Sequence, residues 1–254
     1  MSRAPQGHRP NPGAPYFLLD ALPGAGPFVL GGAEGRHAAT VRRLRVGEVL
    51  VLTDGRGGAA TATVTAAGRG ELTLQVDPAS RDDPPAVRVT LVQAVPKGER
   101  GELAVELATE AGVDALVPWA AARCIARWTP DRSAHGAAKW RAAAAAAAKQ
   151  SRRTFVPAVG ELASTSAVAD LIRSADAAIV LHESATSPLQ GVDLPSSGDV
   201  VVIVGPEGGL TEEELNVFAA AGAVPVRLGP QVLRTSTAGA VVLGALGVLT
   251  GRWT

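Results

Sequence analysis

The chain has 254 residues, of which 46% are hydrophobic and 19% charged, and its 24 basic and 24 acidic side chains leave no net charge at pH 7. This composition is typical of a folded globular protein and excludes a disordered chain, and any nucleic-acid binding must rest on local basic patches. The single cysteine, Cys124, excludes an internal disulfide and a zinc site made of several cysteines. Because no segment matches a signal peptide and the most apolar one, residues 238–250, is shorter than a bilayer span of roughly 20 residues, we expect a cytoplasmic protein with no membrane segment.

The first part of the chain, up to about residue 80, has the pattern of a small β-barrel. After a lead rich in proline and glycine, alternating segments predict strands at residues 48–53, 59–65 and 71–76. One helix is predicted at residues 33–44, with Val41 and Leu44 turned toward the barrel. The acidic and proline-rich residues 81–85 predict a linker, so we expect one domain at residues 1–80 and a second at 86–254.

The second part of the chain alternates strands with helices. Strands are predicted at residues 87–95, 113–117, 177–181, 200–204 and 224–228, and helices at 99–111, 129–148, 167–174, 212–221 and 237–249. In the helix at 99–111 we expect Leu103, Leu107 and Ala111 to form the apolar face, and Gly112 to end the helix. Several strands are continuous runs of Val and Ile, which predicts a parallel sheet covered on both faces, an α/β fold.

The sharpest functional signal is the segment 200–215, in which a buried strand runs into the turn Gly-Pro-Glu-Gly-Gly-Leu at 205–210. Thr211 and Glu214 have the spacing of a capping box that opens the next helix. Because ligands of open parallel sheets bind beyond the carboxyl ends of strands, we expect a cofactor at residues 205–210, with an ordinary tight turn as the alternative. The chain lacks the fingerprints of nucleotide triphosphate and dinucleotide sites, and acids crowd the helix start, so a cationic cofactor fits better than a phosphate.

Basic residues outside that turn are candidates for anion and RNA binding. Arg234 precedes the last helix, which Ser236 or Thr237 is expected to cap, and it is a candidate oxyanion or phosphate binder, with a surface arginine as the alternative. Lys149 complements the dipole at the end of its helix. Candidate contacts to RNA phosphates are Arg152 and Arg153 after that helix and Arg36, His37, Arg42, Arg43 and Arg45 on the N-terminal helix, where a solvated helix face is the alternative. The scattered histidines His8, His37, His135 and His182 lack ligand spacing, so no metal site is expected.

Together these motifs resemble the RsmE family of the SPOUT superfamily, bacterial methyltransferases that act on uracil N3 in 16S ribosomal RNA. The most specific matching segments are residues 203–210 and 228–235. The other matches are Arg36-His37, residues 41–44, Gly47, residues 96–98, Glu102, residues 110–113, Pro118, Arg123 and residues 150–152.

The resemblance implies an N-terminal PUA-like β-barrel for RNA and a C-terminal SPOUT domain, an α/β trefoil knot that binds S-adenosylmethionine (SAM). It implies knot loops at residues 181–184, 204–210 and 228–235, a homodimer, and a uridine at the decoding centre of the small ribosomal subunit as substrate. Arg234 is then the catalytic residue, and the cofactor-binding residues are Leu181, His182, Glu183, Val204, Gly205, Pro206, Glu207, Gly209, Leu228, Gly229, Leu233 and Thr237. The RNA-binding residues are Arg36, Arg42, Arg43, Lys97, Arg123, Arg152 and Arg153.

Two positions depart from the family pattern. Ser236 stands where members often have Glu, and Leu107 where they often have Lys, so the acceptor of the uridine N3 proton is not assigned. The alternatives are a SPOUT methyltransferase for transfer RNA or another ribosomal site, and a non-catalytic RNA-binding protein of ribosome assembly; a dehydrogenase is disfavoured because the dinucleotide fingerprint is missing. The last helix is apolar on all sides, so it must be buried in the core or against a partner subunit.

Overall fold

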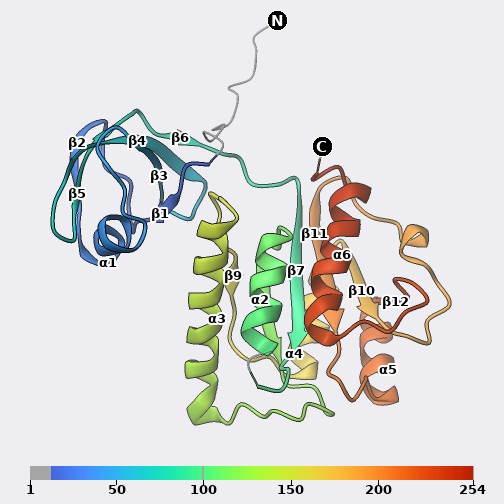
Figure 1. Cartoon of the computed structure of the whole chain (residues 1–254). Helices are drawn as coiled ribbons and strands as arrows, with labels where there is room; N and C mark the ends of the chain where they lie inside the picture. Colours follow the sequence, from blue (N-terminus) through green and yellow to red (C-terminus); the bar gives the residue numbers. More distant parts are fainter. Residues whose placement is uncertain (1–12, 99, 254) are drawn as a thin grey trace, which may run out of the picture. The chain divides into compact units, whose positions relative to one another are not determined.

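The computed structural model describes residues 13–98 and 100–253 (Figure 1), so the expectations for the N-terminal lead and for Glu99 lie outside the described residues. The chain divides into two compact units. Unit 1 is the chain up to Pro84 together with Ala148–Val156, and unit 2 is Pro85–Ala147 together with Pro157–Thr254. The expected division into residues 1–80 and 86–254 places the segment 148–156 in the second domain, whereas it packs with unit 1: the Val156 backbone N–H donates to the Gly55 carbonyl at 3.0 Å.

Unit 1 contains a six-stranded sheet with strand order β1-β3-β4-β5-β2, and β6 pairs with β4. Strand β1 is parallel to β3, and the other pairs are antiparallel. Alternate residues of β3 and β5, such as Leu50, Leu52, Leu72 and Leu74, surround Phe17 in one core cluster. The strands are β1 (Tyr16–Leu18), β2 (Gly26–Leu30), β3 (Val49–Thr53), β4 (Gly58–Ala67), β5 (Leu72–Val76) and β6 (Ser80–Arg81). The three strands predicted from alternation are confirmed, and β6 extends into the expected linker.

The predicted helix at residues 33–44 consists of a short α-helix, α1 (Gly32–Arg36), followed by a π-helix, η1 (His37–Val41). The π turn closes with a hydrogen bond from the Arg42 backbone N–H to the His37 carbonyl at 2.9 Å. This i→i+5 pattern shifts the helix phase relative to the 3.6-residue period that the sequence argument assumes. Val41 is therefore 66% exposed, and the expectation that it faces the barrel is wrong, whereas Leu44 does pack against the core.

Unit 2 is built on a six-stranded, entirely parallel sheet with strand order β12-β10-β11-β7-β8-β9. One core cluster joins α2, α3 and α6 to the sheet and a second joins α4 and α5, so the predicted α/β fold with both sheet faces covered is confirmed. The strands are β7 (Val87–Ala94), β8 (Ala115–Trp119), β9 (Ala158–Val159), β10 (Ala177–Leu181), β11 (Gly198–Val204) and β12 (Val224–Val226). The helices are α2 (Arg100–Glu110), α3 (Pro130–Gln150), α4 (Thr165–Ser174), η2 (Leu189–Gly191), α5 (Glu212–Ala221) and α6 (Thr235–Leu249).

Helix α2 packs through small residues rather than through its leucines. Its buried residues include Gly101, Ala104 and Ala108, whereas Leu103 is 44% exposed and Leu107 is half-buried. Of the predicted apolar face, Ala111 packs against the core, and the expectation for Leu103 is wrong. The reason is close packing: a Cβ at Gly101 would lie 2.9 Å from the Trp140 Nε1 atom of α3. Gly112, with φ of 93°, is the left-handed residue after α2 that the sequence predicts.

The C-terminal end of α6 is tied to the sheet through Arg252. Its guanidinium donates to the Val87 carbonyl at 2.5 Å, to the Gly112 carbonyl at 2.6 Å and to Asp114 Oδ2 at 2.6 Å. The ion pair with Asp114 is largely buried, with 12% and 17% of the two side chains exposed. Because Val87 begins β7 and Asp114 precedes β8, this contact links the end of the chain to two neighbouring strands.

Candidate functional site

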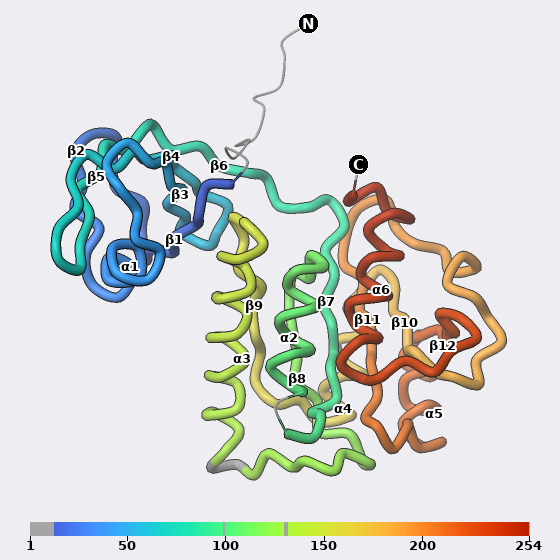
Figure 2. The backbone as a smooth tube through the Cα atoms, in the orientation of Figure 1, coloured from blue at the N-terminus to red at the C-terminus, as the bar shows by residue number. Residues whose placement is uncertain are grey.

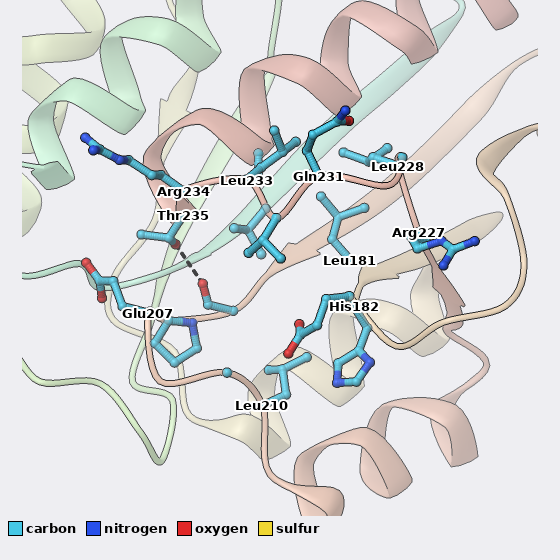
Figure 3. Close-up of a pocket in the computed structure, with 18 of the residues that line it drawn as sticks. Leu181, His182, Glu207, Leu210, Arg227, Leu228, Gln231, Leu233, Arg234 and Thr235 are labelled. Carbon is cyan, nitrogen blue, oxygen red and sulfur yellow. Dashed lines mark hydrogen bonds between the residues drawn. The ribbon is translucent and has the colours of Figure 1, made fainter.

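A cavity of about 410 Å³ lies in unit 2 at the carboxyl ends of β10, β11 and β12. Figure 2 traces the loop that leads from β12 into α6, and Figure 3 shows the side chains that line the cavity. Ligands of parallel α/β sheets bind at this edge, and the volume is in the range of roughly 300–1,000 Å³ found for small-molecule sites. The cavity is lined by the following residues of the expected cofactor site: Leu181, His182, Glu183, Val204, Gly205, Pro206, Glu207, Gly209, Leu228, Gly229 and Leu233.

The centre of the cavity is apolar and its edges are polar. Figure 3 shows Leu181, Leu228 and Leu233 grouped between Arg234 and Glu207 on one side and Arg227 on the other. Such a slot suits a flat ring, because apolar walls with a few polar groups are the common construction of cofactor sites. Two carboxylates, those of Glu183 and Glu207, and three guanidinium groups, those of Arg100, Arg227 and Arg234, line the same cavity, so it offers partners to a ligand that carries both positive and negative groups.

The turn after β11 depends on its glycines for close packing. A Cβ at Gly205 would lie 3.1 Å from Leu210 Cγ, and one at Gly208 would lie 3.1 Å from Arg123 Cβ. Gly209 has a φ of +73°, a conformation that other residues rarely adopt. Gly205 therefore serves the packing of the turn itself, in addition to any approach of a ligand.

The start of α5 holds this turn through Glu214, which is only 3% exposed. The predicted capping box is confirmed: Thr211 Oγ1 accepts from the Glu214 backbone N–H at 3.1 Å, and Glu214 Oε2 accepts from the Thr211 backbone N–H at 2.9 Å. The second carboxylate oxygen, Oε1, accepts from the Ala122 backbone N–H at 2.7 Å. One buried carboxylate thus joins the end of the turn to the segment after β8.

Arg123, an expected RNA-binding residue, also contacts the turn. Its Nη1 donates to the carbonyls of Gly208 at 3.3 Å and Leu210 at 3.1 Å. The side chain remains exposed, so a contact with RNA stays a prediction, but the guanidinium has a structural partner that no local pattern indicated.

Arg234 lies at the edge of the cavity as the N-cap residue of α6. Its exposed guanidinium has no hydrogen bond or ion pair with any residue that the structure describes, so it is available to an anionic group. The expected cap by Ser236 or Thr237 is wrong, because α6 begins at Thr235 and no side chain caps it. Ser236 is buried, and Thr237 is not among the described residues that line the cavity.

The cavity also has lining residues outside the expected set of cofactor-binding and catalytic residues, some of them within the expected loops 204–210 and 228–235. Arg100, at the start of α2, lies with Nη1 3.7 Å from Glu207 Oε1, and the sequence signal for it was only its place beside the Pro96-Lys97-Gly98 segment. The remaining ones are Leu210, Val226, Arg227, Pro230, Gln231, Val232, Thr235 and Ala238.

The expected RNA-binding residues are divided between the two units, with Lys97 and Arg123 in unit 2. Among the described residues, the non-glycine positions with positive φ are Arg43 at 55° and Arg152 at 60°, both in unit 1. Backbone conformations of this kind occur often at functional sites. Exposed residues of the set are Arg36, Arg42, Arg43, Lys97, Arg123 and Arg152, whereas Arg153 is half-buried. Lys149 lies in the last turn of α3, as predicted, and it also forms an ion pair with Glu34 at 2.7 Å that the sequence did not predict.

The pKa values of Cys124 and Asp54 depart from their ordinary values. Cys124 is buried in the core cluster that joins α4 and α5 to the sheet, and burial raises the pKa of its thiol. In unit 1, burial by itself would raise the pKa of Asp54, but the N–H groups of Arg56 and Gly58 and the Arg81 guanidinium outweigh it and lower that pKa.

Within the part of the chain that the structure describes, no cluster of three or more His, Cys, Asp or Glu side chains is placed to hold a metal ion. Over the same residues, no helix combines the length and apolar character needed to cross a membrane.

Residues 83–247 match the family model of the RNA methyltransferase domain, and residues 30–77 match that of the RNA methyltransferase PUA domain. The ribosomal RNA small subunit methyltransferase E of Mycobacterium tuberculosis is 51% identical over 94% of this chain and 94% of its own. The protein of the same name from Bacillus subtilis is 26% identical over 88% of this chain and 90% of its own.

Two solved structures with bound SAM are similar to the chain over most of its length. The ribosomal RNA small subunit methyltransferase E of Neisseria gonorrhoeae has a TM-score of 0.82 at 29% identity, covering 93% of this chain and 98% of that chain. A methyltransferase of Legionella pneumophila has a TM-score of 0.81 at 25% identity, again covering 93% and 98%.

Proposed function

Because the chain belongs to the ribosomal RNA small subunit methyltransferase E family, we propose that it methylates N3 of a uridine at the decoding centre of the small ribosomal subunit. The chain is a SAM-dependent ribosomal RNA methyltransferase. The predicted family, the predicted cofactor and the predicted methylation of ribosomal RNA are therefore confirmed. The target atom, its nucleotide, the knot in the chain and the roles of single residues belong to the proposal.

The observation that carries the proposal is the cavity at the ends of β10, β11 and β12, because its lining fits SAM. Leu181, Leu228 and Leu233 offer apolar walls for an adenine, and the carboxylates of Glu183 and Glu207 suit a ligand with an ammonium group and a positively charged sulfur. When bound, SAM supplies an activated methyl group on that sulfur.

The residues of the chain must make uridine N3 reactive, because N3 carries a proton and is a poor nucleophile until the proton leaves. The developing negative charge spreads onto O2 and O4 of the uracil. The unpaired Arg234 guanidinium at the edge of the cavity is placed to stabilise this charge and to hold the ring in register for transfer.

The RNA backbone is bound, in this proposal, by Arg36, Arg42, Arg43, Arg152 and Arg153 of unit 1, together with Lys97 and Arg123 of unit 2. A π-helix next to an arginine in the left-handed conformation supports a functional surface in unit 1. A cavity of about 540 Å³ lined by Ala14, Pro15, Val41 and Arg42 lies beside this π-helix.

The proposal includes a homodimer and a cytoplasmic location. Support for the dimer comes from α6 and the residues after it, which expose Val241, Val248, Leu249 and Trp253. Val241, Val248 and Leu249 also line a second cavity of unit 2, of about 300 Å³. An apolar surface of this kind is typical of a subunit contact, and sedimentation at micromolar concentration tests it.

The test is methyl transfer from labelled SAM to small ribosomal subunits that lack the modification, followed by mass spectrometry of the nucleosides. We expect 3-methyluridine, and an Arg234→Ala variant with SAM saturating should lose roughly 10²–10³ in kcat, as when one donor to a developing anion is removed. Another methylated nucleoside would overturn the uridine N3 assignment, and near-normal turnover of Arg234→Ala would overturn the role of the arginine. Binding of SAM without any transfer would favour a non-catalytic protein of ribosome assembly.

A further inference from the structure

Gln93 is a polar residue in an unusually apolar place. It is 1% exposed, lies near the carboxyl end of β7, and β7 is an inner strand with β11 and β8 on either side. Inner strands of a parallel sheet are normally apolar, and a buried amide costs free energy unless its atoms have partners. Gln93 Oε1 is buried without a hydrogen-bond partner among the described residues. An apolar residue of similar size would stabilise the core better. The reason for a glutamine at this position must therefore lie in the contacts of its other terminal atom, Nε2.

That atom, Nε2, begins a directed chain of hydrogen bonds. It donates to the Ala94 carbonyl at 3.1 Å and to Thr235 Oγ1 at 3.0 Å, and Thr235 Oγ1 donates to the Gly205 carbonyl at 2.7 Å (the last bond is the dashed line in Figure 3). An amide nitrogen can only donate, so the Thr235 oxygen accepts here and its single proton goes to Gly205. These hydrogen bonds join β7, the turn after β11 and the first residue of α6.

The packing of α6 on β7 brings these groups together. A Cβ at Gly239 would lie 2.8 Å from Leu91 Cδ2 and 3.8 Å from Gln93 Oε1, so the helix approaches the strand more closely than a larger residue would allow. Thr235 is only 7% exposed although it lines the cavity, which limits the access of water to its hydroxyl. The hydrogen-bond chain therefore acts in a nearly dry environment.

The hydrogen bonds that start at Gln93 reach two parts of the site. Gly205 opens the glycine-rich turn that lines the cofactor cavity, and Thr235 directly follows Arg234. The Arg234 guanidinium has no partner among the described residues, so the place of Arg234 depends on its backbone. The Arg234 carbonyl accepts from the N–H groups of Thr237 and Ala238, which fixes it to the start of α6, and the Thr235 hydroxyl joins that start to Gly205.

We propose that Gln93 is a positioning residue of the methyl transfer: through the Thr235 hydroxyl, it sets the distance between Arg234 and the glycine-rich turn. The inference rests on the proposed function, in which Arg234 acts on the bound uracil. Gln93 itself touches neither uracil nor cofactor, and its effect must pass through Arg234.

The experiment compares Gln93→Met, which keeps the length of the side chain but not its donor, with Thr235→Val, which keeps the shape but not the hydroxyl. Thr235→Ser, which keeps the hydroxyl, is the matched control. For each full-length variant we would measure kcat, KM for small subunits, the Kd of SAM by calorimetry, and Tm. Misplacement of a reacting group by about 1 Å can cost about 10²-fold in rate, so we expect kcat to fall roughly 10- to 100-fold in Gln93→Met and Thr235→Val. The Kd of SAM should change far less, and Thr235→Ser should retain most of the turnover.

The decisive comparison adds Gln93→Met to Arg234→Ala. If Gln93 acts through Arg234, the double variant should be no slower than Arg234→Ala alone, because the two changes remove one function. A full additional loss in the double variant would overturn the proposal, as would a Gln93→Met enzyme whose kcat stays within about twofold of wild type. If Gln93→Met fails to fold, the pair Thr235→Val and Thr235→Ser decides, and equal kcat values for these two would also overturn it.

Failure of the inference on Gln93 can be distinguished from failure of the proposed function. The rates can be measured on whichever nucleoside the wild-type enzyme methylates, so a different target base would leave the role of Gln93 intact. Normal turnover of Arg234→Ala would instead remove the premise, and with it the inference.

Discussion

Replacement of Glu214 by Gln tests how the start of α5 supports the cofactor cavity. The carboxylate of Glu214 accepts three hydrogen bonds, from the Ala122 N–H at 2.7 Å, the Thr211 N–H at 2.9 Å and the Thr211 hydroxyl at 3.2 Å. A glutamine has one acceptor oxygen, and its NH₂ group would face a backbone donor. At least one buried N–H must therefore lose its partner.

The expected cost follows from these bonds. A hydrogen bond to a charged group contributes roughly 1.5–3 kcal/mol, and a buried donor left unpaired costs about 1–3 kcal/mol. We expect Glu214→Gln to lower the free energy of unfolding by about 2–4 kcal/mol, out of a total of roughly 5–15 kcal/mol for a typical domain. The affinity for SAM should fall as well, because the turn at residues 205–210 ends at this helix start.

The matched control is Glu213→Gln, which removes the same charge from the first turn of α5 at an exposed position. The effect of charge on the helix dipole is common to both variants, so their difference isolates the buried hydrogen bonds. Urea unfolding monitored by circular dichroism measures the free energies. If Glu214→Gln fell within about 0.5 kcal/mol of Glu213→Gln, which is the usual range of neutral surface changes, the argument from buried hydrogen bonds would be refuted.

Three further changes have defined outcomes. Arg252→Ala should destabilise unit 2 by roughly 3 kcal/mol in calorimetry, because it leaves the largely buried Asp114 carboxylate without its cation; an unchanged Tm would contradict this. The lowered folded-state pKa of Asp54 contributes stability that is present above its ordinary pKa and is lost as the pH falls through the folded-state value. The gap in unfolding free energy between wild type and Asp54→Asn should therefore close as the pH falls below the ordinary pKa, and a constant gap would count against it. Arg42→Ala should reduce the slope of log K for RNA against log salt by about 0.7–0.9 with the Kd of SAM unchanged, and an unaltered slope would remove Arg42 from the RNA surface.

Much of unit 2 and most of its site could be predicted from local patterns. The predicted bounds of β10 and α5 are those of the structure, and the capping box of Thr211 and Glu214 is present. These features depend on side chains within a few positions of one another, so the sequence of a short segment contains the information. The rule that ligands bind at the carboxyl ends of parallel strands then places three loops at one cavity without knowledge of a single long-range contact.

The errors arose where distant residues decide the outcome. The buried face of α2 is the one with Gly101 and Ala108 because Trp140 lies against it, so close packing outweighs the greater hydrophobicity of Leu103. The π turn at His37 shifts the phase of the helix and exposes Val41, which no 3.6-residue period predicts.

From the amino-acid sequence by itself, periodicity determined the α/β class of unit 2 and its parallel sheet. The motifs continuous in the chain determined the family, and the resemblance then implied many of the residues that line the cavity. Only the tertiary structure decided that residues 148–156 return to unit 1, that α6 begins at Thr235, and that Thr235, Arg123 and Glu214 contact the glycine-rich turn or its flanks. It also placed Gln93 in contact with Thr235. The physical reason is the same in each case. A hydrogen bond between groups about 30 to 140 positions apart depends on where the packed sheet places both partners, and this geometry is set by the whole core rather than by either segment.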